Sequence, residues 1–199
     1  MTDAPMTKPE MRELARKNRI AQKNKVELSQ GICAKFLALP AYGKAKLVMW
    51  YVDAGSEVRT RETLPEVLKL PQKVVVPYCI VETNQLELFL LEDMGELVEG
   101  AYRILEPKEE LRNAPGKRIQ PEELDLVMVP GTAFDPQGGR MGQGKGYYDR
   151  LLTGARKDAP LVGMAFDCQV FPSIPVSEHD VFMDMVLTET QSYVCKGRE

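Results

Sequence analysis

The sequence predicts a three-layer α/β/α protein: a mainly parallel central sheet, helices on both of its faces and a helical segment at the N-terminus. Short apolar runs of strand length alternate with helix-favouring stretches along the 199 residues. Hydrophobic residues make up 44% of the chain and charged residues 28%, as in an ordinary globular protein. Because a chain of this length fits one hydrophobic core, we expect a single domain over residues 1–199.

Residues 8–39 are predicted to be helical because Ala, Leu, Lys, Arg and Gln are abundant there and Pro9 lies in the first turn. We expect Gly31 to divide this segment into two helices. The first 25 residues carry seven basic and three acidic side chains, whereas the whole chain has a net charge of −3. A basic element therefore lies on an otherwise acidic protein.

Apolar runs at regular intervals predict the strands of the sheet. The first, residues 47–52, is closed by the turn-forming segment 53–56, and Pro77 is expected to end the second. The other runs and the two further predicted helices lie at residues 73–76, 86–91, 124–129, 161–166 and 185–188 for strands, and 60–70 and 146–153 for helices. Strands and helices that alternate in this way favour parallel pairing.

The composition also excludes several classes of protein. The N-terminal residues contain no apolar run of signal-peptide length, and no segment approaches the ~20 apolar residues of a membrane helix. We therefore expect a cytoplasmic protein that does not contact a membrane. The four cysteines form no CxxC pair, so reduced structural thiols are expected.

A loop rich in glycine is the most informative feature of the sequence. Six glycines lie between Pro130 and Tyr147, where a strand pattern is followed by a helix pattern. Backbone N–H groups, the start of the helix and the cations Arg140 and Lys145 can converge there on one anion and form a phosphate clamp. The alternative is an ordinary long loop whose glycines are needed only for positive φ angles.

Neither common nucleotide motif describes this loop. Residues 139–145 match the P-loop pattern GxxxxGK, but Gly146 stands where a Ser or Thr must bind magnesium. The dinucleotide fingerprint fails because Tyr147 occupies the position of its third glycine. Asp149 falls in the first turn of the following helix, where a carboxylate can hold a magnesium ion or simply cap the helix.

Three ordered segments of the chain resemble the 5-formyltetrahydrofolate cyclo-ligase family, also called methenyltetrahydrofolate synthetases. The resemblance extends over nearly the whole chain. It is carried by Lys8-x-x-x-Arg12; by Pro130-Gly131-x-Ala133-Phe134-Asp135 with Gly138, Arg140, Gly142, Gly144, Gly146, Tyr147, Tyr148, Asp149 and Arg150; and by Pro175-Val176-x-Glu178-His179-Asp180 leading to Asp184 and Thr188-Glu189.

This resemblance implies an enzyme that uses ATP and magnesium to convert 5-formyltetrahydrofolate to 5,10-methenyltetrahydrofolate, with release of ADP and phosphate. Phosphorylation of the formyl oxygen would turn a poor leaving group into a good one. The neighbouring ring nitrogen would then close the five-membered ring. The protein's task would be to position the reactants and to neutralise charge.

The resemblance also implies roles for individual residues. Arg140, Lys145 and Tyr147 are the expected catalytic residues, and Asp149 with Asp184 are the expected magnesium ligands. The expected ATP-binding set is Lys8, Arg12, Arg140, Met141, Gly142, Gln143, Gly144, Lys145, Gly146, Tyr147 and Tyr148. The expected folate-binding set is Val52, Glu57, Gln143, Gly144, Lys145, Gly146 and Tyr147.

Two other functions compete with this interpretation. One is a different ATP-dependent ligase or kinase, which would act on another amide or heterocycle. The other is a nucleotide-binding domain whose basic N-terminal helix binds nucleic acid. Because the basic residues do not interleave with aromatic ones, we expect no nucleic-acid partner. The resemblance implies small-molecule substrates, the reduced folate and ATP. We also expect a monomer or weak dimer.

Overall fold

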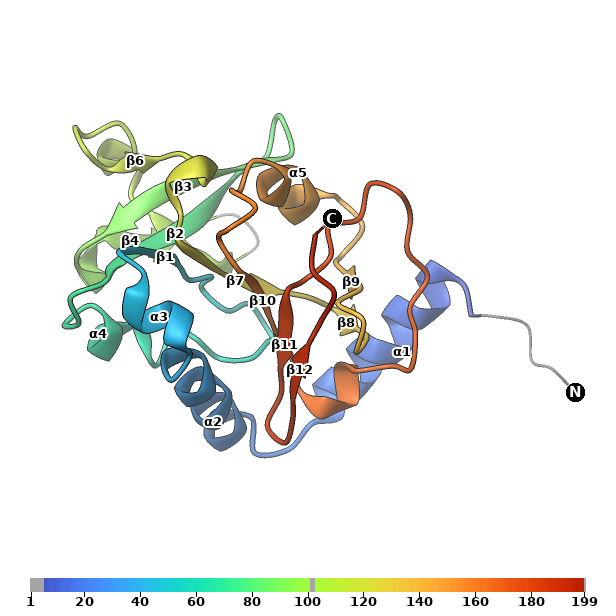
Figure 1. Cartoon of the computed structure of the whole chain (residues 1–199). Coiled ribbons are helices and arrows are strands. Elements are labelled where there is room, and N and C mark those ends of the chain that lie inside the picture. Colours follow the sequence, from blue (N-terminus) through green and yellow to red (C-terminus); the bar gives the residue numbers. More distant parts are fainter. Residues whose placement is uncertain (1–5, 101–102, 199) are drawn as a thin grey trace, which may run out of the picture.

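A computed structural model describes residues 6–100 and 103–198 and shows an eight-stranded mixed sheet with helices on both faces (Figure 1). The helices are α1 (Lys8–Ala21), α2 (Lys25–Leu37), α3 (Pro40–Lys44), α4 (Leu64–Val67) and α5 (Tyr147–Thr153). Short 3-10 helices are η1 (Met94–Glu96), η3 (Glu109–Leu111), η4 (Pro121–Glu123) and η5 (Asp167–Gln169). The predicted α/β architecture is confirmed.

The strands of the main sheet follow the order β12-β11-β10-β7-β1-β2-β3-β6. Their bounds are β1 (Leu47–Met49), β2 (Lys73–Ile80), β3 (Gln85–Leu91), β6 (Arg118–Ile119), β7 (Leu126–Pro130), β10 (Leu161–Met164), β11 (Met185–Leu187) and β12 (Ser192–Val194). The five strands from β11 to β2 are mutually parallel, and β12, β3 and β6 are antiparallel to their neighbours. Two small hairpins accompany this sheet: β4 (Leu97–Glu99) with β5 (Leu105–Pro107), and β8 (Ala133–Phe134) with β9 (Arg140–Met141).

Alternate residues of the central strands supply the two apolar layers of the core. Val48, Val74 and Met128 face one way and pack in the cluster that contains Phe36 of α2. Met49, Val75 and Val127 face the other way and pack in the cluster that contains Leu151 and Leu152 of α5. Strands buried on both faces are expected to be almost continuously apolar, which explains the runs seen in the sequence.

Three local predictions are wrong. Gly31 lies inside α2, and the two N-terminal helices are separated instead at residues 22–24, where Asn24 has a φ of 53°. β2 continues through Pro77 to Ile80. Because β1 pairs only with residues 73–75 of β2, Pro77 lies where β2 has β3 as its one sheet neighbour, and a proline is tolerated there.

The third wrong prediction is the helix over residues 60–70, which is reduced to the four residues of α4. The backbone N–H groups of Thr60 and Arg61 donate to the Asp53 carboxylate at 3.0 and 2.8 Å. These contacts do not by themselves oppose a helix, but Pro65 does: it has no N–H, and its ring would clash with the carbonyl of residue 61 inside a helix that began at residue 60. The helix therefore begins only at Leu64, with Pro65 in its first turn. In the described part of the chain, no helix is long and apolar enough to cross a membrane.

Candidate active site

A cavity of about 1040 Å³ opens at the carboxyl ends of β1 and β7. Ligands of open α/β sheets bind at this edge, because the strands end there and the connecting loops can vary. β1 contributes the segment that follows it, including Tyr51 and Val52, and β7 contributes Pro130. Helix α1, the β2–β3 hairpin and the loop before α5 close the remaining sides. The volume is large enough for two small-molecule substrates.

The glycine loop is held in place by a buried carboxylate. Asp135, at the turn between β8 and β9, accepts hydrogen bonds from the backbone N–H groups of Gly139, Gln137 and Ile174 at 2.8, 3.0 and 3.1 Å. Beyond β9 the chain passes through Gly144 and Gly146, which have φ angles of 93° and 69°. L-residues rarely adopt such angles, so these two glycines allow the loop to turn into α5.

Arg140 is the most buried cation of this loop. Its residue is 4% exposed, and one guanidinium nitrogen lies 2.5 Å from Oδ1 of Asp149. The guanidinium carbon lies 5.7 Å from the centre of the Tyr148 ring. The buried Nε atom has no hydrogen-bond partner within the described residues. A buried donor without a partner is unusual, and this one belongs to a residue that lines the cavity.

Helix α1 brings two further cations to the same cavity. The Lys8 ammonium lies 2.6 Å from the Asp180 carboxylate and 3.2 Å from the Ser177 hydroxyl. Burial alone would raise the pKa of Asp180, but the hydrogen bonds from Lys8 and Ser177 lower it. Arg12 donates through Nε to the carbonyl of Gly142 at 3.0 Å. One turn of α1 is therefore attached to the glycine loop and to the segment that follows η5.

The opposite half of the cavity is less cationic. Val52, Tyr148 and Glu57 line it, and the Glu57 side chain is only 14% exposed. Burial raises the pKa of Glu57; the Arg19 guanidinium and the N–H of Ala54 oppose this shift, and the Asp53 carboxylate adds to it. Burial also raises the pKa of Tyr148, so its hydroxyl is neutral. An apolar and aromatic wall with one carboxylate suits a flat heterocycle that carries N–H donors.

A family model of the 5-formyltetrahydrofolate cyclo-ligase family matches residues 6–189. The chain belongs to this family. As a cyclo-ligase it is an enzyme that performs the ATP-dependent conversion of 5-formyltetrahydrofolate to methenyltetrahydrofolate, and it acts in folate one-carbon metabolism. The expectation drawn from the glycine loop and its flanking segments is thereby confirmed.

Individual relatives agree with this assignment. The 5-formyltetrahydrofolate cyclo-ligase of Mus musculus is 28% identical over 189 residues, which cover 92% of this chain and 89% of that protein. The cyclo-ligase of Mycolicibacterium smegmatis is 32% identical over 152 residues, 75% of this chain and 76% of the relative. The NMR structure of Aquifex aeolicus 5,10-methenyltetrahydrofolate synthetase has a TM-score of 0.82 and 34% identity, and covers 98% of this chain and 96% of that one.

Within the cyclo-ligase, all but one of the site residues predicted from sequence line the same cavity. They are Lys8, Arg12, Val52, Glu57, Arg140, Met141, Gly142, Gln143, Gly144, Lys145, Gly146, Tyr147, Tyr148 and Asp149. Lys145 and Gln143 are exposed at the mouth, whereas Arg140 and Met141 are buried. The guanidinium of Arg150, also in the lining, lies 5.9 Å from the centre of the Tyr147 ring.

Asp184 is the exception, and its predicted partnership with Asp149 does not hold in the structure. Asp184 immediately precedes β11, so it lies at the amino edge of the sheet, away from the cavity. Its carboxylate accepts a hydrogen bond from the N–H of Leu161 at 2.7 Å and lies 3.6 Å from Arg198. Asp184 follows the matched C-terminal segment closely in sequence, and this closeness was misleading. The cavity lies at the carboxyl ends of the parallel strands, whereas Asp184 lies at the amino end of one of them.

Two buried charged residues that sequence reasoning missed also line the cavity. Arg19 and Glu106 are 6% and 2% exposed, and charged side chains are seldom so buried without a paired role. Arg19 follows Lys8 and Arg12 on α1, and its spacing from Arg12 of seven residues, two helical turns, was an available signal. Glu106 accepts a hydrogen bond from the N–H of Cys79 at 3.2 Å, and no local pattern in the sequence marks it.

Proposed function

We propose that the cyclo-ligase binds the two substrates in the two halves of this one cavity. The ATP phosphates occupy the half formed by the glycine loop with Lys8, Arg12 and Arg140, and the folate ring system occupies the half that contains Val52 and Glu57. The observation that supports this division is its charge: cations gather at the glycine loop, and the buried carboxylate faces the apolar wall. The formyl group would then lie between the two halves.

Phosphoryl transfer is the first chemical step of the proposal. The formyl oxygen of 5-formyltetrahydrofolate attacks the γ-phosphorus, the bond from that phosphorus to the bridging oxygen breaks, and ADP leaves. The product is an iminium phosphate. Arg140 is the residue placed to stabilise the charge that spreads over the transferred group, because its guanidinium is buried and always protonated. Lys145, exposed at the mouth, and Tyr147, the partly buried first residue of α5, would contact the reactants from the same loop.

Ring closure is the second step. The neighbouring nitrogen of the folate attacks the iminium carbon, its proton is released, and the carbon–oxygen bond breaks to release phosphate. The bound folate must hold that nitrogen close to the carbon, and orientation of this kind contributes strongly to rate. The Glu57 carboxylate accepts hydrogen bonds from N–H groups of the pterin and so fixes the ring against Val52 and Tyr148.

Magnesium is part of this proposal, and Asp149 is its ligand. No group of three or more His, Cys, Asp or Glu side chains that could hold a metal exists among the described residues. Asp149, in the lining of the phosphate half, nevertheless fits magnesium, which is usually bound through one or two carboxylates plus substrate phosphates. Its Oδ1 atom pairs with Arg140 at 2.5 Å, so Oδ2 would be the atom that binds the ion. When bound, the ion would neutralise charge on the phosphates.

The proposal also covers the partners, the location and the oligomeric state of the enzyme. ATP is the co-substrate, and the folate is the second small-molecule partner. A cytoplasmic location and a monomer or weak dimer remain proposals; the Arabidopsis thaliana relative is named as a mitochondrial enzyme. Lys8, Arg12 and Arg19, three of the basic residues on α1, line the cavity, so we assign the positive charge of this helix to substrate binding instead of nucleic-acid binding.

The experiment that tests the activity follows the near-ultraviolet absorbance of methenyltetrahydrofolate in a mixture of protein, 5-formyltetrahydrofolate and Mg-ATP. We expect the absorbance to rise, one ADP to form for each product molecule, and both signals to vanish without ATP. No rise under any condition would reject the reaction. ADP formation that does not depend on the folate would instead indicate another ATP-dependent ligase or kinase.

Replacing Asp149 with asparagine tests the magnesium ligand. The amide keeps the size of the side chain but removes the charge, so the concentration of magnesium that gives half-maximal activity is expected to rise by about tenfold. The measurement is a magnesium titration of the initial rate at saturating ATP and folate. Asp158→Asn is the matched control, because this exposed carboxylate pairs with the surface residue Arg156 at 3.0 Å and does not line the cavity. An unchanged titration in Asp149→Asn would remove Asp149 from the proposal.

A further inference from the structure

Arg19 joins three separate segments around the folate half of the cavity. Its Nε donates to the Ser56 hydroxyl at 3.0 Å, and a terminal nitrogen donates to the Gly131 carbonyl at 3.0 Å. The same terminal nitrogen lies 3.9 Å from Oε1 of Glu57. A guanidinium whose side chain is 7% exposed must be compensated in this way, because an uncompensated buried charge is strongly destabilising.

Arg19 is also the cation that acts on Glu57. The other Glu57 oxygen, Oε2, accepts a hydrogen bond from the N–H of Ala54 at 3.0 Å. The charged and titratable groups that face this carboxylate are Arg19, Asp53, Tyr51 and Tyr148. Burial and the Asp53 carboxylate raise the pKa of Glu57, and Arg19 opposes them, since its positive charge favours the ionised form.

We propose that Arg19 is a positioning residue for folate recognition, which holds the Glu57 carboxylate in place as an anionic acceptor. This inference rests on the proposed role of Glu57 in binding the pterin. Arg19 itself need not touch the folate, because its hydrogen bonds are made to Ser56 and Gly131. Through the Gly131 carbonyl, the same side chain also contacts the segment that leads from β7 toward Arg140.

The proposal predicts a dependence on pH that ordinary packing would not produce. Without the cation, the pKa of Glu57 rises further, so the protonated form accumulates as the pH falls. A protonated carboxyl is a poorer acceptor for the N–H groups of the pterin. Folate binding should therefore weaken by up to about tenfold for each pH unit below the new pKa. Above that pKa the carboxylate is ionised in both proteins, and the difference from wild type should shrink.

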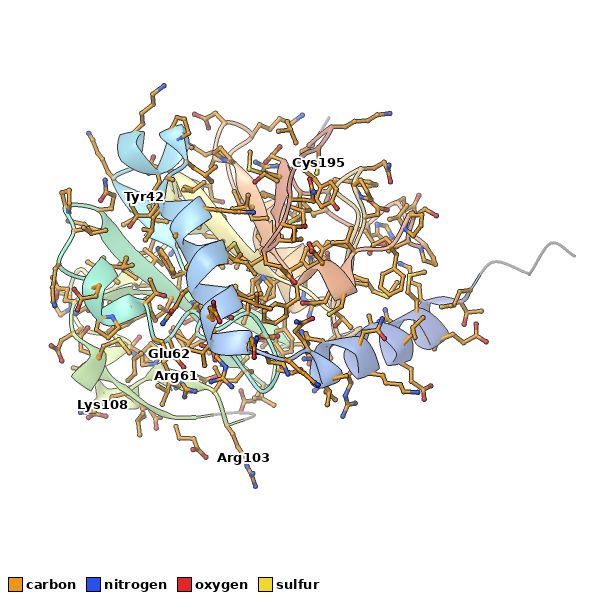
Figure 2. All side chains as sticks on the ribbon, turned by 90° about the horizontal axis from the view of Figure 1, so that it is seen from below. Tyr42, Arg61, Glu62, Arg103, Lys108 and Cys195 are labelled. Carbon is orange, nitrogen blue, oxygen red and sulfur yellow. The ribbon has the colours of Figure 1, made fainter. Side chains whose placement is uncertain are left out.

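Calorimetric titration of Arg19→Met with 5-formyltetrahydrofolate, without ATP, at pH 6, 7 and 8 tests this. Methionine keeps much of the apolar stem and removes the charge. We expect the ratio of its Kd to that of wild type to increase steadily from pH 8 to pH 6. Arg61→Met is the matched control, because Arg61, which is labelled in Figure 2, also lies 3.9 Å from a buried carboxylate, that of Asp53. Its side chain is 50% exposed and does not line the cavity. The ratio for Arg61→Met should stay constant.

Two further variants separate the possible failures. Glu57→Gln should weaken folate binding equally at all three pH values; unchanged binding would show that the proposed role of Glu57 itself is wrong. If Glu57→Gln weakens binding but Arg19→Met gives a constant ratio, only the inference about Arg19 is overturned. Arg19→Lys tests the proposal if Arg19→Met does not fold. Lysine keeps the positive charge but lacks the paired donors of the guanidinium. We therefore expect its Kd to be several-fold higher than that of wild type, by the same factor at all three pH values. An unchanged Kd in Arg19→Lys would contradict the positioning role.

Discussion

Replacing Arg140 with methionine is expected to lower kcat by about 10² to 10³, because one preorganised donor to the transferring phosphoryl group is lost. The guanidinium is buried at the start of the glycine loop and is held by Asp149 at 2.5 Å. A buried charge acts on the transition state more strongly than an exposed one, because less water screens it. The measurement is the steady-state rate of methenyltetrahydrofolate formation at saturating Mg-ATP and folate.

Arg156→Met is the control for this substitution. Arg156 also pairs with carboxylates, those of Asp125 and Asp158, but it is 40% exposed and lies outside the cavity. Its replacement should leave kcat unchanged. Because loss of Arg140 can also destabilise the protein, the melting temperature of both variants should be measured beside the rate. A folded Arg140→Met variant whose kcat stays within threefold of wild type would contradict the proposed role.

Replacing Glu57 with glutamine is expected to raise the KM for 5-formyltetrahydrofolate by roughly 10- to 100-fold, since hydrogen bonds to a charged group contribute about 1.5–3 kcal/mol. The KM for ATP should change little, because Glu57 lies in the other half of the cavity. Glutamine keeps the shape of the side chain and can still accept one hydrogen bond from the N–H of Ala54. Steady-state kinetics with each substrate varied in turn separates the two effects.

Glu62→Gln provides the comparison for Glu57. Glu62 lies five residues further along the chain and pairs with Arg59 at 3.3 Å. It is exposed and does not line the cavity. Its substitution should leave both KM values unchanged. If Glu57→Gln raised the KM for ATP as much as that for the folate, the two halves of the cavity would not correspond to the two substrates.

Local sequence was sufficient for much of this cyclo-ligase. The apolar runs predicted the central strands, because a strand covered on both faces must be apolar at nearly every position. The glycines before α5 and the cations among them predicted a loop at the site, and the loop does line the cavity; its binding of phosphate stays a prediction. The family itself was recognisable from the same residues, and the match over residues 6–189 confirms it.

The tertiary structure decided what depends on distant neighbours. Pro77 is accepted inside β2 because β1 stops pairing at residue 75. Asp184 and Asp149 lie near matched motifs but reach different edges of the sheet. The burial of Arg19 beside Glu57 likewise depends on a contact between residues far apart in the chain. Which charges meet in a low-dielectric cavity is set by contacts between segments far apart in the chain, and local patterns do not encode those contacts.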